Sequence, residues 1–380
     1  EQEEQAEQWA PDGHVEQGVP MDERNTHDNS LEGLLRSWDG EEVLIRRDQP
    51  TGAMIIIAIH STRLGPAGGG TRMKTYPGIA DAVRDAQRLA EGMTFKFAAA
   101  GLPRGGGKAV IAIPPDLDPA ARDDLLRSYG ALIHQLGGLY NTGPDVGTSD
   151  RDMDIIAETG APYVFGRTPE HGGVGDSGPA TAVGVLAGMK ATCAHLFGSD
   201  TLADRRVVVQ GVGKVGHPLL RLLHEEGADI SCSDVDSAAC ERIRAELGCP
   251  VIAPDAVYEA ECDIYSPCAL GAVLNSETIP RLQCRAVVGS ANNQLATPAD
   301  AELLRERGIL YAPDFVVNSG GAVYLLGREL LGWSGDETQE RIVSTVRDTL
   351  AEVYALADAE AIPTSVAAER LAGRRIAGKG

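Results

Sequence analysis

Aromatic residues are scarce in this chain of 380 residues and make up only 4% of it. The apolar fraction is nevertheless 43%, so the hydrophobic cores must be built mainly from Ala, Val, Leu and Ile, accompanied by 45 glycines. This composition is typical of α/β layers, in which many tight turns join strands to helices. The chain is long for a single core and suits two domains.

Positive charge is also in short supply, because 34 Lys and Arg face 55 Asp and Glu and give a formal net charge of −21. Nucleic-acid partners need basic faces, so this class of function is excluded. Part of the acidic excess is local: residues 1–30 hold nine acidic side chains and a single base, Arg24. This Gln-rich segment has no apolar periodicity, so we expect a solvated, disordered tail, with a partner-binding arm as the alternative.

Cysteine is infrequent, and its seven copies lie between residues 193 and 284 without any C-x-x-C pair. The odd number fits no closed disulfide framework, so we expect reduced, mostly buried thiols. Cys262 and Cys268 are five residues apart with no matching His cluster, and no metal is expected. We find no signal-peptide pattern and no apolar run of 18 residues, which predicts a cytoplasmic protein without a membrane span.

The first half of the folded sequence, from about residue 31, alternates regular patterns with glycine-rich segments. A β-rich run predicts a central strand, and apolar residues recurring at helical spacing predict a helix that Gly101 ends. A glycine turn separates these two elements, and a second glycine run leads through Lys108 into another strand. In chain order these are the strand 53–60, the turn 65–70, the helix 79–97, the glycines 105–107 and the strand 109–113.

From about Arg205 the sequence changes to a strict alternation of strand, turn and helix. Strands are expected at 207–210, 228–233, 263–266, 286–289 and 309–312, and helices at 215–225 and 236–247. This alternation is typical of a doubly wound parallel sheet. A helix over 181–196 joins the two halves, and the chain is helical after Gly320.

A G-x-G-x-x-G motif directly follows the first strand of this alternating region and opens a helix. It consists of Gly211, Val212, Gly213, Lys214, Val215 and Gly216. The first glycine permits the turn, the second lets the backbone approach a pyrophosphate, and the third lets helix and strand pack closely. Asp234 ends the next strand, where its carboxylate can accept ribose hydroxyl hydrogens and repel a 2′-phosphate. The pattern predicts an NAD site rather than an NADP site; a plain tight turn is the alternative.

Two lysines lie beside small residues in the first half. Lys96 precedes three alanines and a glycine, and Lys108 follows three glycines. Such surroundings leave room for a substrate, and a lysine withdrawn from water there has its pKa lowered toward neutrality. Asp145 follows in a turn-rich loop. Residue chemistry alone leaves open whether these are surface lysines and a turn-forming aspartate.

Eight segments of the chain resemble the leucine/valine/phenylalanine dehydrogenase branch of the glutamate dehydrogenase superfamily. They occur in the family order over residues 40 to 378, and together they are far more specific than the glycine motif alone. The segments are 65–71, 93–96, 105–108, 145–148, 210–213, 262–271, 289–294 and 311–321.

The resemblance implies a fold, a division into domains and a reaction. Residues 31–180 would form a mixed α/β substrate-binding and catalytic domain, and 181–334 a Rossmann NAD-binding domain, with helices of 335–380 returning to the first. The reaction would be the reversible, NAD-dependent oxidative deamination of an L-amino acid to a 2-oxo acid and ammonia. A homo-oligomer is implied as well.

The resemblance also implies roles for individual residues. Lys96 would bind the substrate carboxylate, and Lys108 would be the low-pKa base that activates water on an imino intermediate. Asp145 would handle protons at the substrate nitrogen. Asn293 and Asn318 would hold the amino group and the nicotinamide in register.

Thr181 would contact the nicotinamide amide. Many relatives carry another hydroxyl beside the proline of this region, where this chain has Gly178, and Ser177 is the residue that can replace it.

The resemblance further implies a substrate pocket lined by Gly68, Gly69, Gly143, Ala322 and Leu325. Relatives that prefer leucine or valine carry larger residues matching Gly68, Gly143 and Ala322, so we expect a large, aromatic substrate side chain. The alternative is that neighbours such as Leu325 or Met73 fill the space and a branched aliphatic substrate is preferred.

Two other classes of function deserve comparison. The segment 175–179 (GDSGP) resembles the nucleophile motif of trypsin-like serine proteases, but that class requires an all-β fold with upstream His and Asp partners. A non-catalytic NAD-binding sensor is possible on the same fold. Retention of Lys96, Lys108 and Asp145 favours the enzyme.

Overall fold

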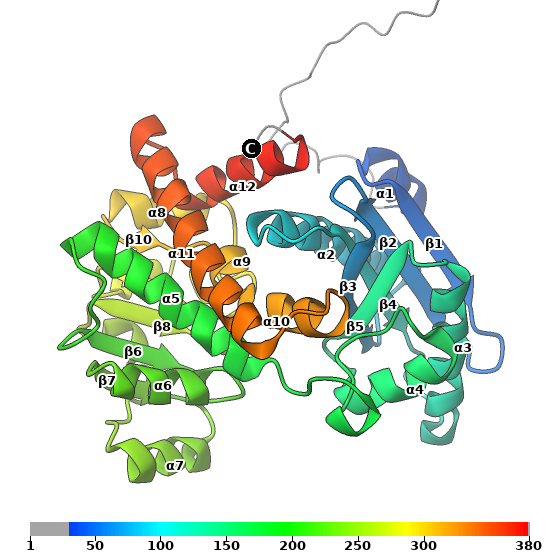
Figure 1. Cartoon of the computed structure of the whole chain (residues 1–380), viewed down its shortest axis with the longest axis horizontal. Helices are drawn as coiled ribbons and strands as arrows, with labels where there is room; N and C mark the ends of the chain where they lie inside the picture. The colour runs from blue at the N-terminus through cyan, green and yellow to red at the C-terminus, as the bar shows by residue number, and fades with distance from the viewer. Residues whose placement is uncertain (1–29, 379–380) are drawn as a thin grey trace, which may run out of the picture.

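The computed structural model describes residues 30–378, and the chain folds there into two α/β domains (Figure 1). The expected acidic tail, apart from Ser30, lies outside the described residues. Ser30 caps the first helix, α1 (Leu31–Ser37), by accepting a hydrogen bond from the Gly33 amide.

A five-stranded mixed sheet forms the first domain, with the strand order β1-β2-β4-β3-β5. The strands β3, β4 and β5 run parallel to one another, whereas β1 and β2 are antiparallel to their neighbours. The strands are β1 (Glu42–Arg47), β2 (Met54–Ser61), β3 (Ala67–Lys74), β4 (Gly105–Ala112) and β5 (Tyr140–Pro144).

Helices cover both faces of this sheet, because successive side chains of a strand point to opposite sides. Ile56 of β2 packs toward α2 (Ile79–Ala99), whereas its neighbours Ile55 and Ile57 pack toward the opposite layer. That layer consists of α3 (Arg122–Gln135) and α4 (Asp150–Gly160). Because β2 is buried on both faces, the segment 53–60 contains many isoleucines. The predicted central strand is confirmed.

The glycines from 68 to 70 and from 105 to 107 lie in strands, so the strand start predicted at 109 is too late. The predicted turn at 65–70 is confirmed only for residues 65 and 66, which form a bend before the strand. β3 begins at Ala67 and β4 at Gly105. The glycines serve close approach: a Cβ on Gly69 would lie 1.9 Å from the Gly107 carbonyl oxygen, and one on Gly106 would lie 2.1 Å from the Thr94 amide of α2. Lys108 therefore lies inside β4 rather than before it.

An all-parallel five-stranded sheet forms the second domain, in the order β10-β9-β8-β6-β7, which confirms the doubly wound arrangement. Val207 and Val209 face the core under α5, and Val208 faces the opposite core. The strands are β6 (Arg206–Gln210), β7 (Asp229–Ser233), β8 (Ile264–Pro267), β9 (Ala286–Val287) and β10 (Leu310–Tyr311). The helices that accompany them are α6 (Gly216–Glu225), α7 (Ser237–Leu247) and α8 (Ala299–Glu306).

Five helices, long and short, connect the two domains (Figure 1). They are α5 (Gly178–Phe197), α9 (Asp314–Val317), α10 (Gly320–Glu329), α11 (Gly335–Glu360) and α12 (Thr364–Ile376). α11 runs along α5, and α12 packs on α2 of the first domain. Arg375 of α12 and Thr349 of α11 both donate hydrogen bonds to the Ala99 carbonyl at the end of α2, at 2.7 and 3.0 Å. The C-terminal helices thus reach the first domain.

The helix α5 is long and apolar enough to cross a membrane by length and composition alone, which the sequence analysis did not anticipate. In the structure it packs against α6, α10 and α11 and contributes to the core of the second domain. Burial between other elements explains its composition.

Short 3₁₀ helices complete the described chain at Pro119–Ala121, Pro169–His171, Val257–Glu259 and Ile279–Arg281. All seven cysteines are free thiols, and five of them are buried, as expected.

Candidate active site

The buried lysine of β4 and the aspartate that follows β5 meet at one end of the first sheet. Lys108 Nζ lies 2.9 Å from Asp145 Oδ2, and the Lys108 residue is only 5% exposed. β3 lies between these two strands, and its Gly70 leaves the space through which they meet. A Cβ on Gly70 would lie 2.9 Å from the Asp145 Cβ. The glycines of β3 are therefore required for the contact between Lys108 and Asp145.

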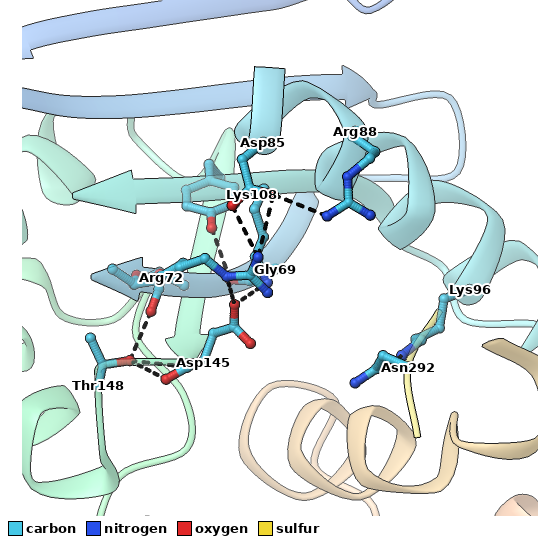
Figure 2. Close-up of polar contacts among 12 residues, drawn as sticks. Gly69, Arg72, Asp85, Arg88, Lys96, Lys108, Asp145, Thr148 and Asn292 are labelled. Carbon is cyan, nitrogen blue, oxygen red and sulfur yellow. Dashed lines mark hydrogen bonds and ion pairs between the residues drawn. The ribbon is translucent and has the colours of Figure 1, made fainter. Parts of the chain in front are cut away.

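The loop after β5 is fixed so that the Asp145 carboxylate points at Lys108 (Figure 2). The Asp145 amide donates a hydrogen bond to Thr148 Oγ1 at 3.0 Å, and that hydroxyl donates to the Thr71 carbonyl of β3 at 2.8 Å. The sequence 145–148 thus forms a turn tied to the sheet.

Arg72 of β3 joins the same carboxylate from another side. Its Nε lies 3.1 Å from Asp145 Oδ2, and its Nη1 lies 3.0 Å from Asp85 Oδ2 on α2 (Figure 2). Asp85 also accepts hydrogen bonds from the Tyr76 hydroxyl at 2.7 Å and from Arg88 at 3.0 Å. Neither Arg72 nor Asp85 was among the residues predicted from the sequence.

Burial and charge act in opposite directions on the central pair. Withdrawal from water lowers the pKa of Lys108, although Asp145 opposes this effect. Burial would raise the pKa of Asp145, yet Lys108 and Arg72 hold it below its usual value. An ionised carboxylate beside a lysine whose pKa is lowered is an arrangement that can exchange protons with a substrate.

Lys96 of α2 faces the second domain. Its Nζ donates to Asn292 Oδ1 at 3.2 Å, and Asn318 Nδ2 donates to the same oxygen at 2.9 Å (Figure 2 shows the first contact). Withdrawal from water lowers the pKa of Lys96 to about 8, with Asp314 acting against it. Lys96 therefore still carries a charge near neutral pH and can bind an anion.

The resemblance places Asn293 at the amino group and the nicotinamide, and in the structure its neighbour Asn292 is the one that contacts Lys96. Asn293 has a left-handed backbone (φ 53°) and a carbonyl that accepts from the Ala272 amide at 2.7 Å. Both asparagines are exposed, so Asn293 stays a candidate contact for the nicotinamide. Asn318 is buried, and within residues 30–378 its Oδ1 has no hydrogen-bond partner, so it is available to a bound molecule.

The glycine motif of the second domain has the geometry that a dinucleotide requires. Gly211 adopts φ 101°, and a Cβ on Gly216 would lie 1.8 Å from the Gly211 carbonyl oxygen. A Cβ on Gly213 would meet nothing within 4 Å, so this backbone is open to a ligand. Asp234, immediately after β7, accepts a hydrogen bond from the Val212 amide at 2.7 Å. The carboxylate is thus fixed beside the cradle, and the residues fit a nicotinamide dinucleotide. Lys214 and Val215 complete the turn, and α6 begins at Gly216.

The start of α5 and the start of α10 meet next to this turn. A Cβ on Gly178 would lie 2.3 Å from the Lys214 carbonyl oxygen, which explains why this chain has no side chain there. Thr181 Oγ1 donates to the Ser177 carbonyl at 3.0 Å, and both residues face Gly321. The structure therefore brings Thr181 and Ser177 together, beside the glycine motif.

Phenylalanine rings occupy the room that the sequence analysis expected beside two pocket glycines. A Cβ on Gly143 would lie 2.2 Å from the ring of Phe165, and one on Gly68 would lie 3.3 Å from the ring of Phe97. Leu325 packs in the same cluster as both rings. Met73 belongs to the core on the other side of the sheet and fills no part of this space. Ala322 is half-buried at the edge of the cluster. Phe165 was not predicted from the sequence, because it lies outside every recognised motif and 22 residues after Gly143.

The fold and the paired lysines and aspartate define an amino-acid dehydrogenase that uses a nicotinamide cofactor. The chain belongs to the Glu/Leu/Phe/Val dehydrogenase family. The model of the Glu/Leu/Phe/Val dehydrogenase dimerisation domain matches residues 44–161. The model of Glutamate/Leucine/Phenylalanine/Valine dehydrogenase matches residues 172–247 and 242–379.

Individual relatives of three substrate types are similar to the chain over nearly its full length. It is 45% identical to leucine dehydrogenase of Geobacillus stearothermophilus, with 90% of this chain and 92% of the relative covered. It is 44% identical to valine dehydrogenase of Streptomyces coelicolor, with 95% and 97% covered. The crystal structure of L-tryptophan dehydrogenase from Nostoc punctiforme superimposes with a TM-score of 0.81 at 38% identity, covering 92% and 99%. The family prediction is confirmed.

Proposed function

We propose that this enzyme oxidises an L-amino acid with a large, aromatic side chain to its 2-oxo acid and ammonia, with NAD as the electron acceptor. The contact between buried Lys108 and Asp145, with Lys96 close by, carries the proposal. Residues 31–180 would supply this chemistry and 181–334 the cofactor site, and the contacts of α12 with α2 support the return of 335–380 to the first domain.

In this proposal Lys96 binds the substrate carboxylate, because an ammonium group that is half-buried and charged near neutral pH suits that anion. Asn292 would help to orient the Lys96 ammonium. Asn318, whose Oδ1 is free within the described chain, would accept a hydrogen from the substrate amine.

A nicotinamide bound here would supply the acceptor for the hydride of the substrate Cα, and residues of this chain would move the protons. Neutral Lys108 takes a proton from the water that adds to the resulting iminium carbon. That proton passes from the Lys108 ammonium through Asp145, 2.9 Å away, to the nitrogen. Lys108, neutral again, then takes the hydroxyl proton as the C–N bond breaks, and ammonia and the 2-oxo acid leave. Burial lowers the pKa of Lys108, which favours the neutral form that the first of these steps requires.

NAD is favoured over NADP because Asp234 lies where the adenosine ribose is expected. The Val212 amide fixes the Asp234 carboxylate, which would accept hydrogens from the ribose hydroxyls. A 2′-phosphate at the same place would suffer like-charge repulsion. Thr181 and Ser177 would contact the nicotinamide end.

One observation favours a second candidate, a branched aliphatic substrate. The rings of Phe165 and Phe97 fill the room beside Gly143 and Gly68, so the pocket is narrower than the missing side chains suggest. Gly69, Ala322 and Leu325 would form the rest of its wall. Similarity to leucine and valine dehydrogenases supports this candidate, and similarity to a tryptophan dehydrogenase supports the aromatic one.

A homo-oligomer in the cytoplasm is part of the proposal. Its support is the match of residues 44–161 to a dimerisation domain and the similarity to metabolic dehydrogenases.

An NADH absorbance assay over the twenty amino acids tests the function. We expect turnover with hydrophobic L-amino acids and NAD, and the reverse reaction with 2-oxo acids, ammonia and NADH. If none of the twenty amino acids is oxidised with either NAD or NADP, the proposal is refuted. A preference of tenfold or more for leucine or valine over phenylalanine and tryptophan would establish the second candidate instead.

A further inference from the structure

Arg72 is the centre of a row of four charged side chains that crosses from β4 to α2. In order, the row consists of Lys108, Asp145, Arg72 and Asp85, with contacts of 2.9, 3.1 and 3.0 Å (Figure 2). Charges alternate along the row, and its two inner side chains are poorly exposed: 23% for Asp145 and 17% for Arg72. A guanidinium group suits this position because it bonds two carboxylates in fixed directions.

Asp145 Oδ2 contacts both Lys108 and Arg72, so the two cations share one carboxylate oxygen. This arrangement has a consequence for Lys108. A carboxylate that contacts Lys108 alone would strongly stabilise the ammonium form of Lys108. A carboxylate whose charge Arg72 already balances stabilises that form less. Arg72 also repels the Lys108 proton directly, while Asp145 and Asp85 attract it.

We infer that Arg72 is a positioning residue that keeps Asp145 a carboxylate between two cations and thereby keeps Lys108 available as a base. This inference rests on the proposed roles of Lys108 and Asp145. Arg72 does not itself touch the reacting atoms in this account. Asp85 anchors Arg72, with Tyr76 and Arg88 bonded to the outer side of Asp85.

The groups that face Lys108 come from three elements. They are Asp145 after β5, Arg72 on β3 and Asp85 on α2, with Lys96 further along α2 and Tyr140 on β5 behind the glycines of β4. Because Lys108 must be neutral to act, turnover rises as the pH rises through its pKa. A change that favours the ammonium form therefore moves the acidic limb of the pH profile to higher pH.

The test is the pH dependence of kcat for four enzymes: wild type, Arg72→Met, Asp85→Asn and Arg88→Gln. Arg72→Met removes a positive charge next to Asp145, so the acidic limb should move up by about one pH unit. Asp85→Asn removes a negative charge that favours the ammonium form, so the limb should move down. Arg88→Gln is the matched control: Arg88 bonds the same Asp85 but is 50% exposed and leaves the limb unmoved.

A purely structural role predicts a different result. Loss of packing would lower kcat equally at every pH and in the same sense for both Arg72→Met and Asp85→Asn. Two results would overturn the inference. One is that the acidic limbs of Arg72→Met and Asp85→Asn both stay within about 0.2 pH unit of the wild-type limb. The other is that both limbs shift in the same direction. If Arg72→Met does not fold, the inference is tested by comparing Arg72→Lys with Asp85→Asn. Arg72→Lys keeps the positive charge, so its acidic limb should shift less than that of Asp85→Asn.

Two controls separate this inference from the proposed function. KM for the amino acid and the affinity for NADH, measured by fluorescence, should stay within about threefold of wild type. Lys108→Ala should be inactive at all pH values. An active Lys108→Ala enzyme would refute the proposed function itself, whereas an inactive one with unmoved limbs in the Arg72 and Asp85 variants would refute only the inference.

Discussion

The two sheets of this enzyme offer different kinds of groups at the proposed site. The first sheet brings charged side chains such as Lys108 and Asp145 together beside the glycine-rich segments of β3 and β4. The second sheet offers the open backbone of the glycine motif and one carboxylate, Asp234. Substitutions in the first domain should therefore change turnover or the binding and choice of amino acid, and substitutions around the glycine motif should change cofactor choice.

Lys108→Ala is expected to have the largest effect. Loss of the general base should lower kcat by about 10³-fold or more, while the affinity for NADH remains within twofold, because Lys108 lies on the other domain. Steady-state rates and a fluorescence titration on one preparation measure both quantities. Turnover near that of wild type would remove Lys108 from the mechanism.

Lys96→Met should act on substrate binding rather than on the cofactor. Loss of a charge-assisted contact with the carboxylate should raise KM for the amino acid by about 10- to 100-fold. The KM for NAD serves as the internal control and should change little. An unchanged amino-acid KM would show that another group binds the carboxylate.

Asp234→Ala tests the second domain. We expect the ratio of kcat/KM for NAD to that for NADP to fall by about tenfold or more, because the repulsion of a 2′-phosphate and the ribose hydrogen bonds are both lost. The amino-acid KM should not move. If wild type uses NADP as efficiently as NAD, the assignment of Asp234 is wrong.

Phe165→Ala has the smallest expected effect on overall activity and the clearest effect on selectivity. Removal of the ring beside Gly143 should raise kcat/KM for tryptophan relative to valine by about tenfold. Phe197→Leu, a phenylalanine change at the far end of α5, is the control and should leave this ratio unchanged. An unchanged ratio in Phe165→Ala would show that this ring does not limit the pocket.

The sequence predicted the second domain better than the first, for a physical reason. Its strands are runs such as Val207, Val208 and Val209 between clear turns, and its glycine motif acts through backbone geometry that the pattern specifies. The strands of the first domain were harder to predict, because glycine has little preference for strands. Gly68, Gly69 and Gly70 nevertheless lie in β3, where the lack of side chains allows close packing.

The candidate site was recovered in part. Motif resemblance pointed to Lys96, Lys108 and Asp145, and the structure brings the last two together. Arg72 and Asp85 escaped notice, because their contact depends on how α2 lies over β3 rather than on their spacing. The choice between Asn292 and Asn293 likewise depends on a left-handed backbone that the repeated residue does not reveal.

The most direct test of the account is to measure NADH and ammonia together for wild type and Asp145→Asn with the preferred amino acid. The substitution keeps the size of the side chain but removes the charge that Lys108 and Arg72 share. We predict one ammonia for each NADH in wild type and at least a thousandfold loss of both products in Asp145→Asn, with NADH binding unchanged. Near-normal formation of both products by Asp145→Asn, or NADH without ammonia from wild type, would contradict the account.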